Sequence, residues 1–211
     1  MTDNPKIGAA ATRIDGRLKV TGEARYASDW PLADPAYAVL ATSAVARGRI
    51  AAIDERESRA LPGVLDILTH QNIAEAVKPV EFFAEGGYVG STIRPLASDR
   101  IWHAGQIVAV VLAETFEAAR DAAHRLKVSY AEETPSAGFD SPGAEGVAAK
   151  DVAKNYEDPE VGDAAGAYMA APVKHDAWYA TPTQHHNPIE LFTTSCAWAD
   201  GTLTIWESSQ N

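Results

Sequence analysis

The residues of this chain that are best suited to chemistry are two adjacent histidines, His185 and His186. Imidazole nitrogens are common metal ligands, so the pair suggests a zinc or transition-metal site. Neighbouring side chains of an extended chain point to opposite faces, however, and no third ligand accompanies the pair at helical spacing. We therefore expect a structural or hydrogen-bonding role for both histidines, and no metal ligands in the chain.

No other pattern supplies a complete catalytic site, and we expect no catalytic residue. The remaining histidines are isolated from one another, which favours surface or hydrogen-bonded core positions: His70, His103, His124 and His175. There is no Gly-x-Ser-x-Gly elbow and no glycine-rich turn that opens a helix. The single cysteine, Cys196, excludes an intramolecular disulfide and any cysteine-built zinc or iron–sulfur site. Its place in an alternating pattern predicts a small core residue.

The elements that would position a site begin after a small, polar N-terminal tail, residues 1–12. Turns at Asp15-Gly16 and Gly22 predict a short strand between them. Residues 37–45 predict a buried strand, and residues 49–53 predict its antiparallel neighbour.

A second set of elements follows in the same domain. Residues 100–103 predict a strand that pairs with 107–113, whose continuous apolar character is typical of a central strand. Thr115 is suited to cap the helix that comes next. The elements alternate without a regular βαβ rhythm, so residues 13–130 predict an α+β domain with a mixed sheet and packed helices.

The composition changes after residue 130. Residues 131–163 carry nine acidic side chains against two lysines, together with several prolines and glycines, which predicts an acidic linker. Asp163 precedes a predicted helical turn. Residues 173–181 alternate as a strand does, and Asp200-Gly201 predicts a tight hairpin between two further strands.

Charge and length exclude several classes of protein. The chain has 211 residues and a net charge of −11, with no basic stripe, so we expect no nucleic-acid partner. No apolar run approaches the ~20 residues that cross a bilayer, and no secretory leader is visible, so we expect no membrane partner. These features predict a cytoplasmic protein, although a partner subunit with an export signal would place it in the periplasm.

Four stretches together resemble the molybdenum hydroxylases, the xanthine dehydrogenase and aldehyde oxidase family. They read ATRIDGRLKVTGEARYASD (11–29), LPGVLDILT (61–69), HAGQIVAVVLAETFEAA (103–119) and YATPTQHHNPIE (179–190). The resemblance implies that residues 13–130 form the hammerhead domain of the large subunit. It further implies that residues 164–211 are the truncated start of its molybdenum-cofactor domain.

The family's large subunit binds molybdopterin, often as a dinucleotide, and hydroxylates an aldehyde or N-heterocycle with oxygen from water. Electrons pass to a [2Fe–2S] subunit and an FAD subunit. The resemblance therefore implies these cofactors in the complete assembly, with the rest of the molybdenum subunit and the two redox subunits as partners and a small molecule as substrate. Ser208-Ser209-Gln210 matches the family's Thr-Gln step, whose glutamine hydrogen-bonds an oxo ligand of molybdenum.

Two departures from the family pattern limit what the chain can do. Leu191-Phe192 stands where many members have Pro-His, and the glycine-rich loop, the substrate-facing arginine and the late glutamate base are absent. We therefore expect the isolated chain to be inactive and to bind no cofactor. The alternative is a non-catalytic docking scaffold derived from the hammerhead domain, and metal analysis of the purified complex distinguishes the two.

Overall fold

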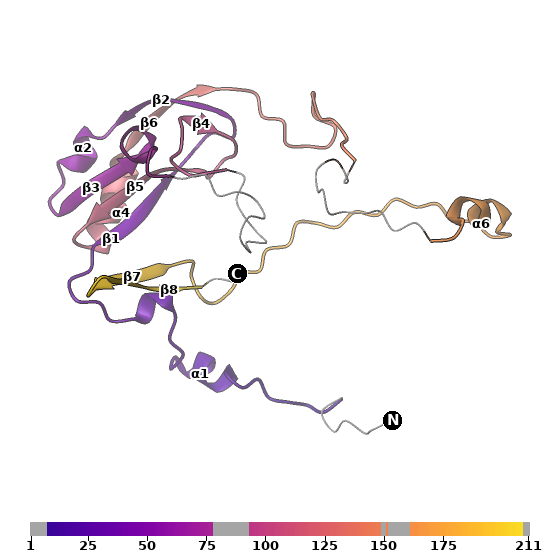
Figure 1. The fold of residues 1–211 in the computed structure, drawn as a ribbon, viewed down its shortest axis with the longest axis horizontal. Helices are drawn as coiled ribbons and strands as arrows, with labels where there is room; N and C mark the ends of the chain where they lie inside the picture. Colours follow the sequence, from indigo (N-terminus) through magenta and orange to yellow (C-terminus); the bar gives the residue numbers. More distant parts are fainter. Residues whose placement is uncertain (1–7, 78–92, 149–150, 152–160, 209–211) are drawn as a thin grey trace. The chain divides into compact units, whose positions relative to one another are not determined.

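A computed structural model describes residues 8–77, 93–148, 151 and 161–208 (Figure 1). The chain divides into two compact units, residues 1–133 with 188–211, and residues 134–187. Antiparallel sheets and short helices make up the first unit, which confirms the predicted α+β class. None of the described helices is long and apolar enough to span a membrane.

The helices are short, and most of them flank strands. Those of the first unit are α1 (Gly16–Thr21), η1 (Ala27–Asp29), α2 (Arg56–Arg59), α3 (His70–Ile73) and α4 (Phe116–Arg125). Its strands are β1 (Tyr37–Thr42), β2 (Gly48–Asp54), β3 (Val64–Thr69), β4 (Arg100–Ile101), β5 (Ile107–Ala113), β6 (Lys127–Glu132), β7 (Thr194–Ala199) and β8 (Thr202–Glu207). The second unit contains α6 (Ala164–Ala170), which Asp163 caps as predicted by accepting a hydrogen bond from the Gly166 N–H.

The first sheet has the strand order β1-β5-β3, so β5 is its central strand as predicted. All seven residues of β5 are apolar, and four of them are buried: Val108, Ala109, Val111 and Ala113. The strand packs against α4. The core here is built from fully buried Ile67, Val111 and Ala122. Thr115 caps α4 through a hydrogen bond from the Ala118 N–H, at 3.2 Å, which confirms the predicted helix start.

The second sheet has the order β4-β2-β6 and corrects two predicted pairings. Residues 100–103 do not pair with 107–113, and residues 49–53 do not pair with 37–45; the strand formed there, β2, pairs with β4 and β6.

Gln106 explains the first of these corrections. Its buried side chain accepts a hydrogen bond from the Trp102 N–H at 2.8 Å and donates one to the Arg100 carbonyl at 2.7 Å. These are backbone groups that a hairpin with β5 would have to use, so the side chain diverts β4 away from β5.

Gly48 explains the second correction. It has φ of +147°, a backbone conformation that favours glycine, at the first residue of β2. A Cβ at this position would lie 2.3 Å from the Ala131 carbonyl oxygen of β6. Glycine therefore lets the chain leave β1 and enter the second sheet in close contact with β6.

The segment that was predicted as a short strand before Gly22 is the helix α1. Lys19 forms an ion pair with Asp15 at 2.7 Å, a spacing of four residues that stabilises a helical turn. Gly22 has φ of +74°, and its N–H bonds to the Leu18 carbonyl, which ends the helix. The ion pair and the glycine at the end of the helix therefore favour a helix over the predicted strand.

Residues 173–181 were also predicted as a strand, and this prediction is wrong, because the segment has no regular structure. The side chains alternate suitably, but a strand also needs a neighbouring backbone to take its N–H and C=O groups. No ladder includes this segment within the described ranges. Its aromatic side chains are highly exposed, with Trp178 at 88%.

Candidate functional site

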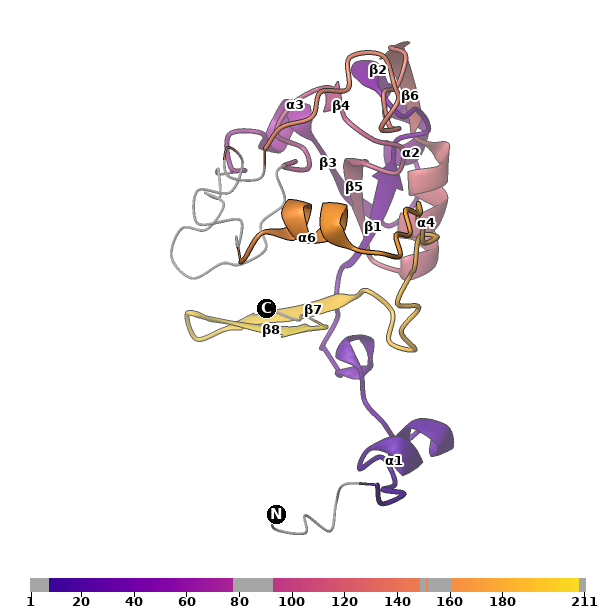
Figure 2. The same cartoon turned by 90° about the vertical axis from the view of Figure 1, so that its right-hand side faces the viewer.

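The one predicted cofactor-binding residue, Gln210, lies outside the described residues. The structure describes the hairpin that leads to it, β7 and β8, in the first unit (Figures 1 and 2). Asp200 and Gly201, between the strands, have φ of 49° and 76°. Two consecutive positive values are the signature of a type I′ turn, so the predicted hairpin is confirmed.

The hairpin exposes its apolar face. Cys196 pairs with Ile205, and Trp198 with Leu203, so these four side chains share one side of the two strands. Trp198 is 70% exposed and Ile205 54%. The predicted core position of Cys196 is therefore wrong, because nothing described covers this face of the two-stranded sheet and the thiol is exposed.

The opposite face of the hairpin meets an N-terminal segment, residues 25–30, which we call the strap (Figures 1 and 2). The indole rings of Trp30 and Trp206 stack with their centroids 5.5 Å apart and their planes at 21°. The Ala27 N–H donates to the Glu190 carboxylate at 3.1 Å. A cavity of about 330 Å³ lies beside these contacts.

Only one feature of the sequence points to this junction. Glu190 is 163 residues from Ala27, and neither residue belongs to a periodic pattern. A tryptophan in the turn-rich run Asp29-Trp30-Pro31 was the one available signal, because a large aromatic ring in a short loop usually packs against another element.

The histidines do not form a site. His185 and His186 are exposed in an irregular segment of the second unit. His70 places its Nδ1 atom in a buried position without a hydrogen-bond partner, and the His103 ring contacts the neighbouring Ala104 carbonyl at 2.8 Å. Within the part of the chain that the structure describes, no group of three or more His, Cys, Asp or Glu side chains is placed to hold a metal ion.

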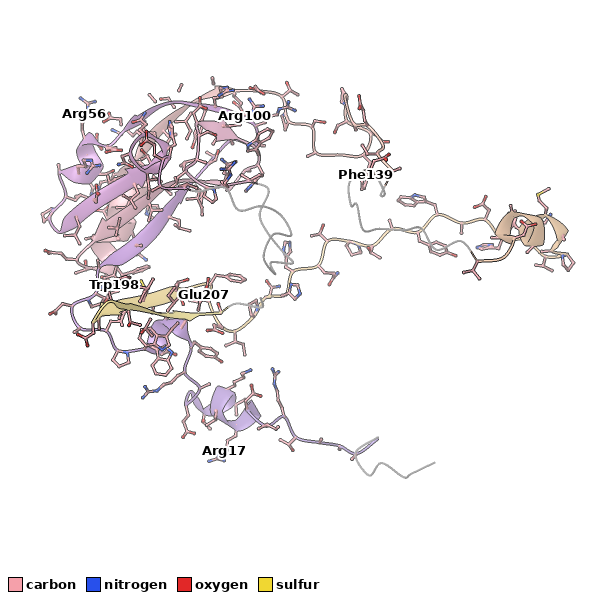
Figure 3. The ribbon with its side chains drawn as sticks, in the orientation of Figure 1. Arg17, Arg56, Arg100, Phe139, Trp198 and Glu207 are labelled. Carbon is pink, nitrogen blue, oxygen red and sulfur yellow. The ribbon has the colours of Figure 1, made fainter. Side chains whose placement is uncertain are left out.

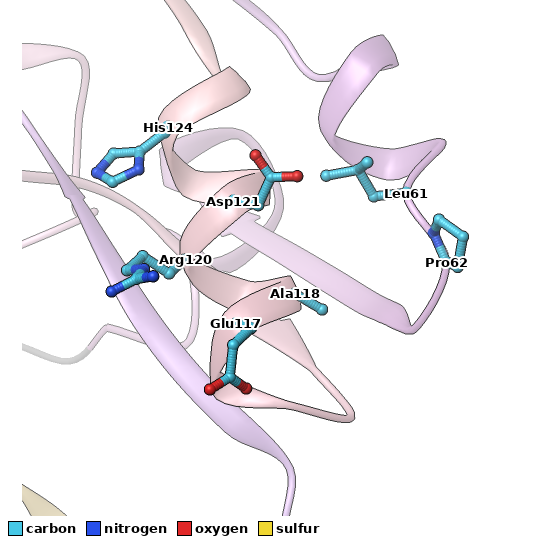
Figure 4. Close-up of a pocket in the computed structure, with 7 residues that line it drawn as sticks. All are labelled: Leu61, Pro62, Glu117, Ala118, Arg120, Asp121 and His124. Atoms are coloured by element: carbon cyan, nitrogen blue, oxygen red, sulfur yellow. The ribbon is translucent and has the colours of Figure 1, made fainter.

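A groove of about 510 Å³ follows one face of α4 (Figure 4). Figure 4 shows Glu117, Arg120, Asp121 and His124 extending from the helix, with Leu61 opposite. Asp121 is already paired with Arg125 at 3.0 Å. The groove thus has solvated charges along one helix and no nucleophile with a neighbouring base, so we assign it no chemistry.

The electrostatics of the first unit centre on Glu133. Arg100 holds this carboxylate with two hydrogen bonds, of 2.5 and 2.9 Å, and Arg47 adds a third at 3.2 Å. The hydrogen bonds from Arg100, with a smaller contribution from Arg47, lower the pKa of Glu133 below its ordinary value. The cluster joins the end of β6 to β4, and Figure 3 labels its Arg100. We assign it a structural role.

Two small antiparallel sheets with packed helices give this chain the fold of a hammerhead domain. Residues 21–134 match the family described as aldehyde oxidase and xanthine dehydrogenase, a/b hammerhead domain. The chain belongs to this family.

Relatives with known names extend the match beyond that domain. The molybdenum-binding subunit PaoC of an aldehyde oxidoreductase from Escherichia coli (strain K12) is 37% identical over 206 residues, which cover 97% of this chain and 26% of the relative. Aldehyde oxidase from Homo sapiens is 35% identical over 130 residues, 61% of this chain and 9% of the relative. The chain therefore spans about a quarter, or less, of the length of these relatives.

A solved structure agrees with the assignment. The copper- and molybdenum-containing CO dehydrogenase in its carbon monoxide-reduced state aligns with a TM-score of 0.50 and 26% identity, over 64% of this chain and 17% of that chain. The aligned part of this chain is only slightly longer than the hammerhead domain.

Proposed function

We propose that this chain is the N-terminal part of the molybdenum-binding subunit of a hydroxylase that oxidises an aldehyde or an N-heterocycle with oxygen from water. The hammerhead is its scaffold, and β7 and β8 are the first strands of its cofactor domain. The relatives support the proposal because PaoC is named a molybdenum-binding subunit and is similar over 97% of this chain.

The observation that carries the proposal is the uncovered apolar face of the hairpin. A two-stranded sheet is at best marginally stable alone, and exposed clusters of large apolar side chains mark interaction surfaces. Trp198, Leu203 and Ile205 are all about half exposed or more. A cofactor domain that continues from these strands would cover them.

The described residues do not by themselves form a cofactor cradle. They contain no cluster of ligating side chains in the described ranges, and Gln210 lies outside those ranges. A bound molybdopterin group would supply the redox chemistry. The role that we assign to this chain is to hold the hairpin, and to present the Gln210 amide as a hydrogen-bond donor three residues after β8 ends at Glu207.

The partners in this proposal are the remainder of the molybdenum subunit, an iron–sulfur subunit with a [2Fe–2S] centre and an FAD subunit. The complete enzyme is proposed to be cytoplasmic, unless a partner carries an export signal. The isolated chain is proposed to be inactive and free of cofactor.

A charge placed on the apolar face tests the proposal. We expect Trp198→Glu to reduce the molybdenum that copurifies with the tagged chain from its host by at least about tenfold, equivalent to about 1.4 kcal/mol of binding free energy. The control is Phe139→Glu in the second unit, where an aromatic ring is already fully exposed (Figure 3). Equal molybdenum in both variants would contradict a covered hairpin face.

A further inference from the structure

The contact between the strap and the hairpin joins two ends of the chain across a long intervening segment. Residues 25–30 and 190–207 fall in one compact unit, whereas residues 134–187 form the other. Within the first unit the hairpin contacts the strap, through β7 and η1.

The first contact satisfies an otherwise unpaired donor. Ala27 is the first residue of η1, and the first N–H groups of a helix have no partner inside it. Ala27 is only 5% exposed, so its N–H is shielded from water, and the Glu190 carboxylate accepts the hydrogen bond. Loss of that carboxylate would leave a buried donor unpaired.

The second contact is the stack of Trp30 on Trp206. Offset aromatic pairs at this separation stabilise a contact beyond the area that they bury. Trp206 lies on the polar face of the hairpin, opposite Trp198. The hairpin thus uses its one aromatic side chain on that face to meet the strap, and no described residue covers the apolar face.

We infer that this junction is an intramolecular lock, in which the strap is the receptor for segment 190–207 and Glu190 and Trp206 are positioning residues. The lock sets the place of the hairpin independently of the covalent connection through residues 134–187. This inference goes beyond the proposed function, because it requires no cofactor and no partner subunit.

The ring stack gives a direct spectroscopic readout on the intact chain. Two stacked indoles couple and produce an exciton couplet in circular dichroism. We expect the couplet in the wild-type chain and in the matched control Trp198→Phe, and its loss in both Trp30→Phe and Trp206→Phe. Amide protection of β5 serves as the check that each variant is folded. A couplet that is absent from the wild type, or that Trp198→Phe abolishes, would overturn the stack.

Cleavage of the connection tests the lock itself. A specific protease site is inserted between the exposed residues Gly146 and Val147, and the folded chain is cut there. We expect the two halves to remain together in size-exclusion chromatography. Glu190→Ala should weaken their association at least about tenfold, and Glu190→Gln, whose amide oxygen can still accept the Ala27 N–H, should restore most of it.

The contrary outcomes are distinct from those of the proposed function. Separation of the wild-type halves after cleavage, with β5 still protected, would show that the connection and not the junction holds the hairpin. Equal behaviour of Glu190→Ala and Glu190→Gln would remove the carboxylate from the lock. Absence of molybdenum from the purified complex would overturn the proposed enzyme role and leave the lock unaffected.

Discussion

At the scale of single residues, paired charges and buried hydrogen bonds join segments that are distant in sequence. Ser58 is fully buried and donates to the Ala122 carbonyl at 2.8 Å, which fastens α2 to α4. Glu133 ties β6 to Arg100 and Arg47 in the same way on the surface. None of these pairings has a sequence signal, because each joins residues 64, 33 or 86 positions apart.

Glu133 gives the chain a predictable response to acid. Its pKa is lowered in the folded state, so the arginine pairs stabilise the fold above the ordinary carboxyl pKa of about 4.3 and are lost as pH falls through the lowered value. We expect Glu133→Gln to unfold at lower denaturant concentration than the wild type at pH 7, and the difference to vanish in acid. Chemical denaturation at several pH values measures this. Glu145→Gln is the control, and a difference that persists in acid would contradict the pairing.

At the scale of elements, backbone geometry decides how the strands are shared between two sheets. Gly48 directs β2 away from β1, and the Gln106 side chain directs β4 away from β5. Gly48 and Gln106 thereby keep β2 and β4 in the second sheet, which contributes Ile50 and Ile101 to the core. These two side chains pack against Val108 of β5.

Substitution of Gly48 tests this geometry. We expect Gly48→Ala to lower the free energy of unfolding by more than about 1 kcal/mol, because the new Cβ meets the Ala131 carbonyl and the positive φ disfavours a side chain. Gly146→Ala, in open space without a positive φ, should change it little. Equilibrium denaturation measures both. A neutral Gly48→Ala would mean that β2 and β6 are not paired as described.

The elements show what sequence could predict. The central strand 107–113, the Thr115 cap and the Asp200-Gly201 hairpin were predictable, because each follows from local patterning or turn chemistry. Strand pairing was not, since it depends on single side chains such as Gln106. The strand predicted for residues 173–181 was wrong because a strand also needs a neighbouring backbone. Their side-chain pattern suits a strand, but no described strand pairs with them. Gln210 as the cofactor-binding residue stays a prediction, since it lies outside the described residues, and the strap contacts could not be predicted.

At the scale of the whole molecule, the two units differ in what holds them. The first has two core clusters, whereas no described residue of the second, 134–187, is buried. We expect strong amide protection at Ile107–Ala113 and weak protection at residues 202–208 in the isolated chain, because one apolar face of the hairpin is uncovered. Hydrogen exchange with mass spectrometry measures both. Equal protection in the two strands would contradict an uncovered face.

The same contrast predicts where the isolated chain is cut. The proposed acidic linker, residues 131–163, should be the first site of limited proteolysis, since charge and proline leave little apolar surface to hold it. The ion pairs of Glu133 and the pairing of β6 to Glu132 place the first cuts after residue 133. Initial cleavage between Ile107 and Tyr130 would contradict the proposed domain boundary.

We propose that this hammerhead chain works within a molybdenum hydroxylase. The most direct measurement is the molybdenum and pterin content of the complex that copurifies with the tagged chain from its own host. We expect one molybdenum and one pterin for each copy of the chain. A stable complex that contains neither would contradict it, and would identify the chain as a docking scaffold without a catalytic assembly.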